Sequence, residues 1–165
     1  TRRISSAASD VYKRQRLIQS LDINKNDTVL TIGSGVGYTS VILSYLCNTV
    51  IGIESIKSFY DFSVDVLIKL EVNNVVFIKS KIENGYSDQQ PYDSIFIEGG
   101  VNHVPIEILN QLSENGRLVA VEIKEGNIGK ATMYQRYGKE FLKNYLFDAY
   151  VPIFEGFKKN QNFNF

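Results

Sequence analysis

The residues best suited to chemistry lie between Thr28 and Glu54. An apolar, β-branched run leads into three closely spaced glycines, Gly33, Gly35 and Gly37, and a second apolar run ends at Glu54. Glycine lets a backbone approach a ligand closely, because any Cβ atom would collide with it. A carboxylate ending the second strand can accept hydrogen bonds from both hydroxyls of a ribose, each worth about 1.5–3 kcal/mol. Together these residues predict a strand–turn–helix–strand unit that binds a nucleoside.

The spacing of the glycines narrows the choice of nucleoside. The dinucleotide motif G-x-G-x-x-G would place its third glycine at position 38, where this chain has Tyr38. The chain instead shows G-x-G-x-G, the usual variant in methyltransferases that use S-adenosylmethionine. A turn that only packs a strand against a helix is the alternative, but it would need neither three glycines nor Glu54. We therefore favour an adenosyl ligand.

Composition limits the class of protein. The chain has 165 residues, of which 44% are hydrophobic, and this is enough for one domain with a buried core. Its 18 basic and 18 acidic residues cancel, which argues against electrostatic capture of nucleic acid or a membrane. No apolar run approaches the roughly 18 residues of a membrane span, and no secretory signal opens the chain. We expect a cytoplasmic protein that binds neither nucleic acid nor membrane.

Two single residues exclude other chemistries. Cys47 is the only cysteine, which fits a reducing cytoplasm, and its apolar context predicts a buried side chain rather than a nucleophile. His103 is the only histidine, so neither a zinc site nor a Ser-His-Asp triad is credible. The sequence therefore assigns no metal and no catalytic residue.

Strand and helix periods alternate along most of the chain. We expect strands at about 28–32, 49–54, 75–79, 94–98 and 117–123, and helices at about 38–46, 57–71 and 105–112, after a short helix around Leu17, Ile18 and Leu21. Asn115-Gly116 is expected to turn the chain into the fifth strand. Two aromatic, β-branched runs at 130–137 and 143–152 flank Gly138 and predict a β-hairpin. A mostly parallel sheet closed by a hairpin differs from a dehydrogenase, which repeats a second mononucleotide-binding half.

The two ends of the chain do not follow this pattern. Residues 1–15 are polar, basic and rich in small residues, and they look like a translated adaptor remnant. We expect 1–15 to be a non-native extension, 16–157 to be the folded domain, and 158–165 to be a frayed tail. A native N-terminal extension is the alternative interpretation. If 1–15 are foreign, the natural protein began further upstream.

From Arg16 onward the chain resembles one family, the protein-L-isoaspartate O-methyltransferases, particularly their short bacterial form. The resemblance is carried by VLTIGSGVGYTS, VIGIES, NGYSDQQPYDSIFIEGG, LNQLSENGRLV and DAYVPIF. It implies a Rossmann-like α/β sandwich with a mostly parallel seven-stranded sheet whose last strand inserts antiparallel. It also implies protein repair by methyl transfer from S-adenosylmethionine to the free carboxylate of isoaspartyl residues in damaged proteins. We expect the protein to act as a monomer.

The resemblance also implies a set of cofactor-binding positions at the ends of four strands. Gly33, Ser34 and Gly35 would line the methionine and ribose portion, and Glu54 would hold the ribose hydroxyls. Ser55 and Ile56 would lie beside the adenine, and Lys81-Ile82 occupies the place where the family usually presents an acid and a glycine to it. The full set of candidates is Gly33, Ser34, Gly35, Gly37, Glu54, Ser55, Ile56, Lys81, Ile82 and Glu98.

Three positions depart from the family pattern. Thr31 stands where the family has an acid near the methionine amino group, and Lys81 replaces an acid that faces adenine. Lysine cannot accept a hydrogen bond from the adenine amino group. Glu98-Gly99-Gly100 replaces a run of small residues after the fourth strand. The first two changes predict weaker cofactor binding, because each removes one charge-assisted contact. Losing two such contacts costs about a few kcal/mol in binding free energy.

Other readings of the sequence remain open. Enzymes that methylate amino groups of nucleic acid bases carry a D/N-P-P-Y/F run where this chain has Glu98-Gly99-Gly100, and the chain is not basic. A carboxylate acceptor is ionised at pH 7 and needs no general base, so a chain with one histidine suffices. A non-catalytic S-adenosylmethionine-binding core and a small-molecule methyltransferase of the same fold are the remaining alternatives. Glu98 either faces the pocket or lies on a solvated rim.

Overall fold

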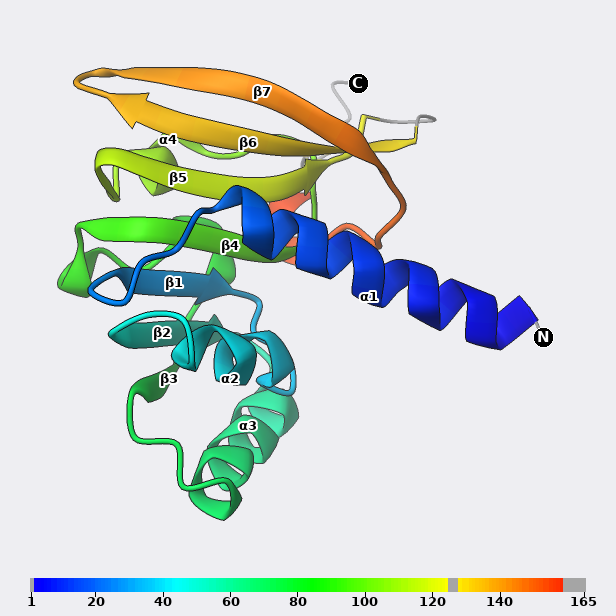
Figure 1. Cartoon of the computed structure of the whole chain (residues 1–165), viewed down its shortest axis with the longest axis vertical. Helices are drawn as coiled ribbons and strands as arrows, with labels where there is room; N and C mark the ends of the chain where they lie inside the picture. Colours follow the sequence, from blue (N-terminus) through cyan, green and yellow to red (C-terminus); the bar gives the residue numbers. More distant parts are fainter. Residues whose placement is uncertain (1, 125–127, 159–165) are drawn as a thin grey trace, which may run out of the picture.

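The computed structural model describes residues 2–124 and 128–158, with side chains from residue 10 onward. Its centre is one seven-stranded sheet in the order β3-β2-β1-β4-β5-β6-β7 (Figure 1). The strands are β1 (Thr28–Ile32), β2 (Thr49–Glu54), β3 (Val75–Lys79), β4 (Tyr92–Val101), β5 (Leu112–Glu122), β6 (Gly129–Tyr137) and β7 (Glu140–Ala149). The helices are α1 (Arg2–Ser20), α2 (Tyr38–Ser44), α3 (Lys57–Lys69) and α4 (Ile106–Leu109), with short 3-10 helices η1 (Ile82–Asn84), η2 (Ser87–Gln89) and η3 (Glu155–Phe157).

The sheet is buried on both faces because its central strands are apolar at consecutive positions, as parallel strands require. Leu30 and Ile32 of β1 pack in a cluster with α4, η1 and η3 on one face. Val29, one position along the same strand, packs in a second cluster with α1, α2 and α3 on the other face. Since β1 pairs in parallel with both β2 and β4, the chain reverses its direction of winding between β1 and β4. Ligands of such sheets bind outside the carboxyl ends of the strands at this point.

The predicted fold class is confirmed, with one correction in its topology. The five strands β1–β5 pair in parallel, and β6 and β7 form the expected antiparallel hairpin around Gly138. The expectation that the last strand inserts into the sheet was wrong, because β6 pairs directly with β5 and β7 lies at the edge. No helix connects β5 to β6, so the chain turns back directly and β6 pairs with β5 as its neighbour in the sheet.

Several element boundaries also differ from the sequence-based expectation; β4 continues past 98 to Val101, and β7 begins at Glu140 rather than at 143. The expected short N-terminal helix is one helix of 19 residues, α1, whose N-terminal turns extend past the carboxyl ends of the strands (Figure 1). The helix expected at 105–112 is confined to the four residues of α4, because β5 already begins at Leu112, which pairs with Tyr92. Asn115 therefore lies inside β5 with a φ of 62°, at an irregular stretch of the strand rather than in a connecting turn.

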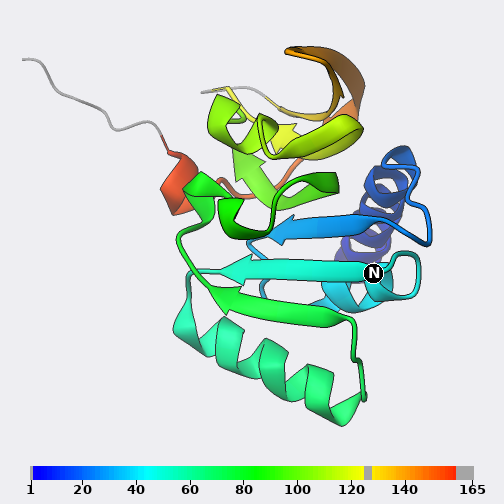
Figure 2. The same ribbon diagram turned by 90° about the vertical axis from the view of Figure 1, so that its left-hand side faces the viewer.

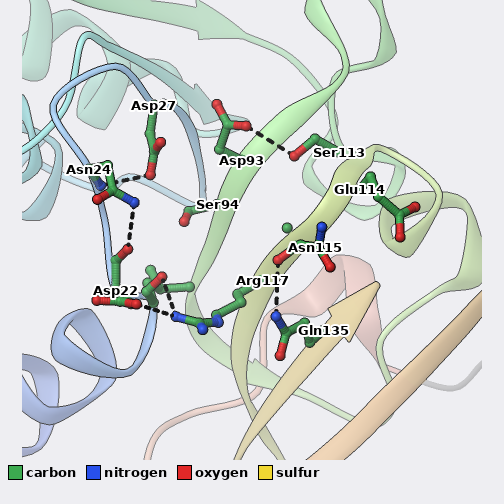
Figure 3. Close-up of a pocket in the computed structure, with 12 residues that line it drawn as sticks. Asp22, Asn24, Asp27, Asp93, Ser94, Ser113, Glu114, Asn115, Arg117 and Gln135 are labelled. Carbon is green, nitrogen blue, oxygen red and sulfur yellow. Dashed lines mark hydrogen bonds and ion pairs between the residues drawn. The ribbon is translucent and has the colours of Figure 1, made fainter. Parts of the chain in front are cut away.

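The amino ends of the strands are tied together around Asp93 (Figure 3). One carboxylate oxygen of Asp93 accepts a hydrogen bond from the Thr28 backbone N–H at 2.8 Å, and the other accepts one from the Ser113 hydroxyl at 3.0 Å. A cavity of about 230 Å³ lies here, and Arg117, one of its lining residues, forms an ion pair with Asp22 at 3.1 Å. The carboxylate of Asp93 thus joins β1, β4 and β5 at the end of the sheet opposite the glycine turn.

Two further expectations can be compared with the described residues. Cys47 is 6% exposed and packs in the cluster on the α1 face, which confirms a buried filler residue. In the described part of the chain no helix is long and apolar enough to cross a membrane. Residues 159–165 of the expected tail lie outside the described residues.

Candidate functional site

The glycine turn after β1 is held by backbone hydrogen bonds to β2. The N–H groups of Gly33 and Ser34 both donate to the carbonyl of Ile53, at 3.0 and 3.1 Å. The three glycines of the turn have φ values of 71°, 53° and 83°, in the left-handed region that other residues adopt only at a cost. Gly37 also has no room for a side chain, because a Cβ there would lie 2.8 Å from the Phe77 ring. A Cβ on Gly35 would meet nothing within 4 Å, so this residue faces open space.

Glu54 closes the turn from the neighbouring strand. Its carboxylate is 4% exposed; one oxygen accepts a hydrogen bond from the Gly35 N–H at 2.7 Å and the other from the Ile56 N–H at 2.9 Å. A carboxylate offers about four acceptor positions, so each oxygen keeps one for a further donor. The structure therefore brings Glu54 and the glycine turn into direct contact, as the predicted nucleoside unit requires.

The residues expected beside the adenine lie at the ends of β2 and β3. Ser55 and Ile56 are exposed, and Lys81 is exposed at the start of η1. The backbone N–H of Ser80 donates to the Glu54 carbonyl at 3.1 Å, which places the two strand ends side by side. The Ile82 side chain is 5% exposed and belongs to the apolar cluster under η1. Only the backbone of Ile82 is therefore available to a ligand at this edge.

Glu98 lies near the carboxyl end of β4, which continues to Val101, and next to the glycine turn. Because Ile97 pairs with Ile32, Glu98 stands beside Gly33 at the point where the sheet reverses its winding. The Thr39 hydroxyl, in the first turn of α2, donates to Oε2 of Glu98 at 2.8 Å. Oε1 is sealed from solvent and has no partner among the described residues, although Glu98 as a whole keeps some exposure. A buried carboxylate oxygen without a partner is costly, and a donor from a ligand would satisfy it.

The surroundings of Glu98 change its acidity. The pKa of this carboxyl is raised from 4.5 to about 8, mainly by burial and to a small extent by the charge of Glu54, against the opposing effects of the Thr39 hydrogen bond and the charge of Arg14. Strongly shifted carboxyl groups that face a cleft are characteristic of functional sites. Arg14 belongs to α1 and lies over the Tyr38 ring at 5.6 Å from its centroid.

Thr31, the position where the family has an acid, does not point to a ligand. Its side chain is completely buried, and its hydroxyl is hydrogen-bonded to that of Ser40 in α2 at 2.8 Å. The hydroxyl pair fixes α2 against β1. On the adjacent strand β4, Glu98 brings a carboxylate to this end of the sheet.

The C-terminal segment after β7 crosses the same edge of the sheet. Residues 151–157 form a strap, in which Phe154 donates its N–H to the Gly100 carbonyl at 2.9 Å. A Cβ on Gly33 would lie 2.6 Å from Cε2 of Phe154, and a Cβ on Gly99 would lie 2.5 Å from Cζ of the same ring. The phenyl ring therefore rests directly on the backbone at the ends of β1 and β4.

Three contributors to this site were missed in the sequence. Thr39 lies within the family-like segment VLTIGSGVGYTS and Phe154 within DAYVPIF, but neither residue was given a role from the sequence. Arg14 falls within residues 1–15, which we set aside as foreign; that interpretation stays a prediction. An arginine close to Tyr38 and to an unpaired carboxylate is a relationship that only folding reveals.

A broad groove lies away from the glycine turn. It has a volume of about 960 Å³ and runs over β5, β6 and β7, where it is lined by polar residues such as Glu122, Lys143 and Tyr145. Glu122 accepts hydrogen bonds from the Tyr134 hydroxyl and the Lys143 ammonium group, and Lys143 lies over the Tyr134 ring at 5.2 Å. These groups satisfy one another and point to a structural network on the sheet.

Comparison with known proteins shows which family the chain is similar to. Residues 3–158 match the family model of protein-L-isoaspartate(D-aspartate) O-methyltransferase. A protein-L-isoaspartate O-methyltransferase of Pseudomonas paraeruginosa is 30% identical over 131 residues, which cover 79% of this chain and 62% of the relative. One of Desulfotalea psychrophila is 37% identical over 102 residues, which cover 60% of this chain and 46% of the relative. The chain thus spans about half to six-tenths of the length of these relatives.

Solved structures share its fold. A protein-L-isoaspartate O-methyltransferase structure aligns with a TM-score of 0.80 at 23% identity, covering 85% of this chain and 45% of the other. A beta-aspartate methyltransferase from Plasmodium falciparum, in complex with S-adenosyl-L-homocysteine, aligns with a TM-score of 0.68 at 22% identity. The alignment covers 88% of this chain and 71% of the other. At these identities the likeness concerns the fold. On the family match over residues 3–158, the chain belongs to the protein-L-isoaspartate(D-aspartate) O-methyltransferase family.

Proposed function

We propose that this chain is the core of an S-adenosylmethionine-dependent methyltransferase that acts on the free carboxylate of isoaspartyl residues in damaged proteins. The observation that carries the proposal is the contact of the Glu54 carboxylate with the Gly35 N–H, at the point where an α/β sheet binds its ligand. The family match supports the choice of reaction. We further propose that the protein works as a monomer in the cytoplasm.

The residues present fit an adenosyl cofactor at most of its contacts. Each oxygen of Glu54 keeps an acceptor position for a ribose hydroxyl. Gly35 leaves open space above the turn, and Ser55, Ile56, Lys81 and the backbone of Ile82 form the edge where adenine would lie. S-adenosylmethionine supplies a methyl group on a positively charged sulfur.

Glu98 supports the methionine end of the same site. Thr31 cannot provide the acid that the family places near the methionine amino group, whereas Oε1 of Glu98 is buried and without a partner among the described residues. An ammonium group at Oε1 would satisfy this oxygen with a charge-assisted hydrogen bond. We therefore propose that Glu98 takes over on β4 the role that the family gives to an acid on β1.

The proposed methyl transfer requires no general base from the chain. An isoaspartyl carboxylate has an ordinary pKa of about 4 and attacks as the ionised nucleophile at pH 7, without a general base. The chain must hold the two reactants in line and keep water out. Since acceptor carboxylate and sulfonium lose their charges together, a dry site at the end of β4 favours transfer.

The test of this proposal has two stages. Calorimetric titration with S-adenosylhomocysteine should show saturable binding of one ligand per chain. Methyl transfer to an isoaspartyl peptide is then compared with transfer to the same peptide containing ordinary aspartate, which should not be methylated. Replacing residues 1–15 by a family-like N-terminus should raise the rate. Binding without any transfer, also after this replacement, would favour the non-catalytic core.

A further inference from the structure

One aromatic side chain takes up space where the cofactor would meet the glycine turn. The ring of Phe154 lies against Gly33 and Gly99 so closely that neither position could carry a Cβ atom. Gly33 opens the glycine turn, and Gly99 follows Glu98 at the end of β4. The ring thus covers the backbone between the two strands where the sheet reverses its winding.

The strap that carries Phe154 is anchored at both sides of the ring. Before it, Gly100 donates its N–H to the Pro152 carbonyl at 2.8 Å, and the Phe154 N–H returns a bond to Gly100 at 2.9 Å. After it, Phe157 is 6% exposed in the apolar cluster, with its ring 6.4 Å from that of Phe154. Figure 2 shows η3, the end of the strap, on the side to which the arrowheads of β1, β2 and β3 point.

The strap reaches from β4 to η1, the segment that follows β3. Gly156 lies so close to the Glu83 carboxylate in η1 that a Cβ there would be 2.7 Å from Oε2. Since η1 is the segment that follows β3 in the chain, the strap contacts β4, the glycine turn after β1 and the segment after β3. The segments that would hold the methionine and adenine portions are therefore bridged by one short piece of chain.

The Phe154 ring packs against the apolar cluster but is not enclosed by it. Its side chain is only partly buried, and its neighbours Glu155 and Gly156 are exposed. A rotation of the ring would keep the two backbone bonds to Gly100 and the anchor at Phe157. Turning the ring away from Gly33 would free the backbone of the glycine turn.

We propose that Phe154 gates the methionine end of the cofactor site: its ring competes with the cofactor for the backbone of Gly33 and turns away when the cofactor binds. This inference rests on the proposed function, since it requires an adenosyl ligand at the glycine turn. The gate lowers affinity and links cofactor binding to the strap at the edge where an acceptor protein approaches.

The decisive experiment compares S-adenosylhomocysteine binding by calorimetry in the unaltered chain, Phe154→Ala and Phe154→Leu. Removing the competing ring should tighten binding about tenfold in Phe154→Ala, with a smaller gain in Phe154→Leu, whose side chain is narrower than the ring. Tyr150→Ala is the control, because Tyr150 is 83% exposed just before the strap, and its affinity should not change. Equal or weaker binding by both Phe154 variants would show that the ring is a fixed wall of the site.

A second measurement does not depend on truncating the ring. The chain has no tryptophan, so Phe154→Trp introduces a single fluorescent reporter at the gate. Addition of S-adenosylhomocysteine should shift its emission as the ring leaves Gly33, and a saturated complex with unchanged emission would overturn the gate. If the unaltered chain binds S-adenosylhomocysteine but substitutions of Phe154 change neither the affinity nor the emission, the gate alone is refuted. Absence of binding in every variant, Phe154→Ala included, refutes the proposed function and the gate with it.

Discussion

The carboxylate of Glu54 and the backbone N–H of Gly35 lie 2.7 Å apart, and this hydrogen bond joins the end of β2 to the glycine turn after β1. One acidic side chain thereby fixes the shape of the turn and keeps acceptor capacity for a ligand. Its second oxygen, bonded to the Ile56 N–H, also begins the connection into α3. The residue that would bind the ribose is therefore the residue that builds the cradle.

Replacing Glu54 by alanine should weaken S-adenosylhomocysteine binding at least about tenfold, because both ribose contacts are lost. The measurement is calorimetric titration, accompanied by thermal unfolding to show that the variant is folded at the temperature used. Glu107→Ala is the control, since Glu107 is exposed on α4, and it should bind as the unaltered chain does. Unchanged affinity in Glu54→Ala would remove Glu54 from the site.

Two glycines with similar backbone conformations allow the effect of backbone strain on stability to be measured separately from an effect on cofactor binding. Gly35 has a φ of 53° and Gly138, at the tip of the β6–β7 hairpin, has a φ of 59°; a Cβ at either would meet nothing within 4 Å. Each alanine variant should lose about 1–2 kcal/mol of unfolding free energy from the left-handed conformation. Only Gly35→Ala should also lose cofactor affinity, because its Cβ would enter the cradle.

This pair is measured by urea unfolding and by ligand titration on the same samples. If Gly138→Ala weakens binding as much as Gly35→Ala, the effect comes from general destabilisation, and the open space at Gly35 is not the ligand site.

Glu98 should make the unaltered chain less stable as the pH rises. Its pKa is about 8 in the folded protein and 4.5 ordinarily, so between these values the folded state holds a proton that the unfolded state has released. Rising pH in this window therefore favours unfolding. Glu98→Gln cannot ionise, so it should be the more stable protein at pH 9, by at least about 1 kcal/mol, and should gain nothing at pH 4.

Urea unfolding of both proteins at several pH values from 4 to 9 checks this prediction. Parallel curves for Glu98→Gln and the unaltered chain would mean that the pKa of Glu98 is the same in the folded and unfolded states. The same variant should bind S-adenosylhomocysteine more weakly, because a neutral amide cannot form an ion pair with an ammonium group.

The thiol of Cys47 should be inert in the folded protein. Burial raises its pKa to about 11, and the side chain is 6% exposed, so almost no accessible thiolate exists near neutral pH. A disulfide reagent at pH 8 should label Cys47 only at the rate of unfolding, and rapidly in urea. Rapid labelling of the native chain would show that the cluster around Cys47 opens locally.

The sequence by itself determined the elements around the site. The glycine turn, the two strands beside it and Glu54 at the end of β2 follow from local periodicity, turn chemistry and residue spacing, which act over a few neighbouring positions. The same local signals predicted the hairpin around Gly138 and the buried thiol of Cys47. They misplaced the start of β5, because the pairing of Leu112 with Tyr92 overrides the turn preference of Asn115-Gly116.

Only the tertiary structure decided which side chains meet at the cradle. Thr39 and Glu98 are 59 positions apart in the chain, and their hydrogen bond exists because α2 begins beside the end of β4. The ring of Phe154 reaches Gly33 because the strap pairs with Gly100 after β7. A residue pattern specifies which face of a strand is buried, but the partner across that face is set by how distant segments pack together.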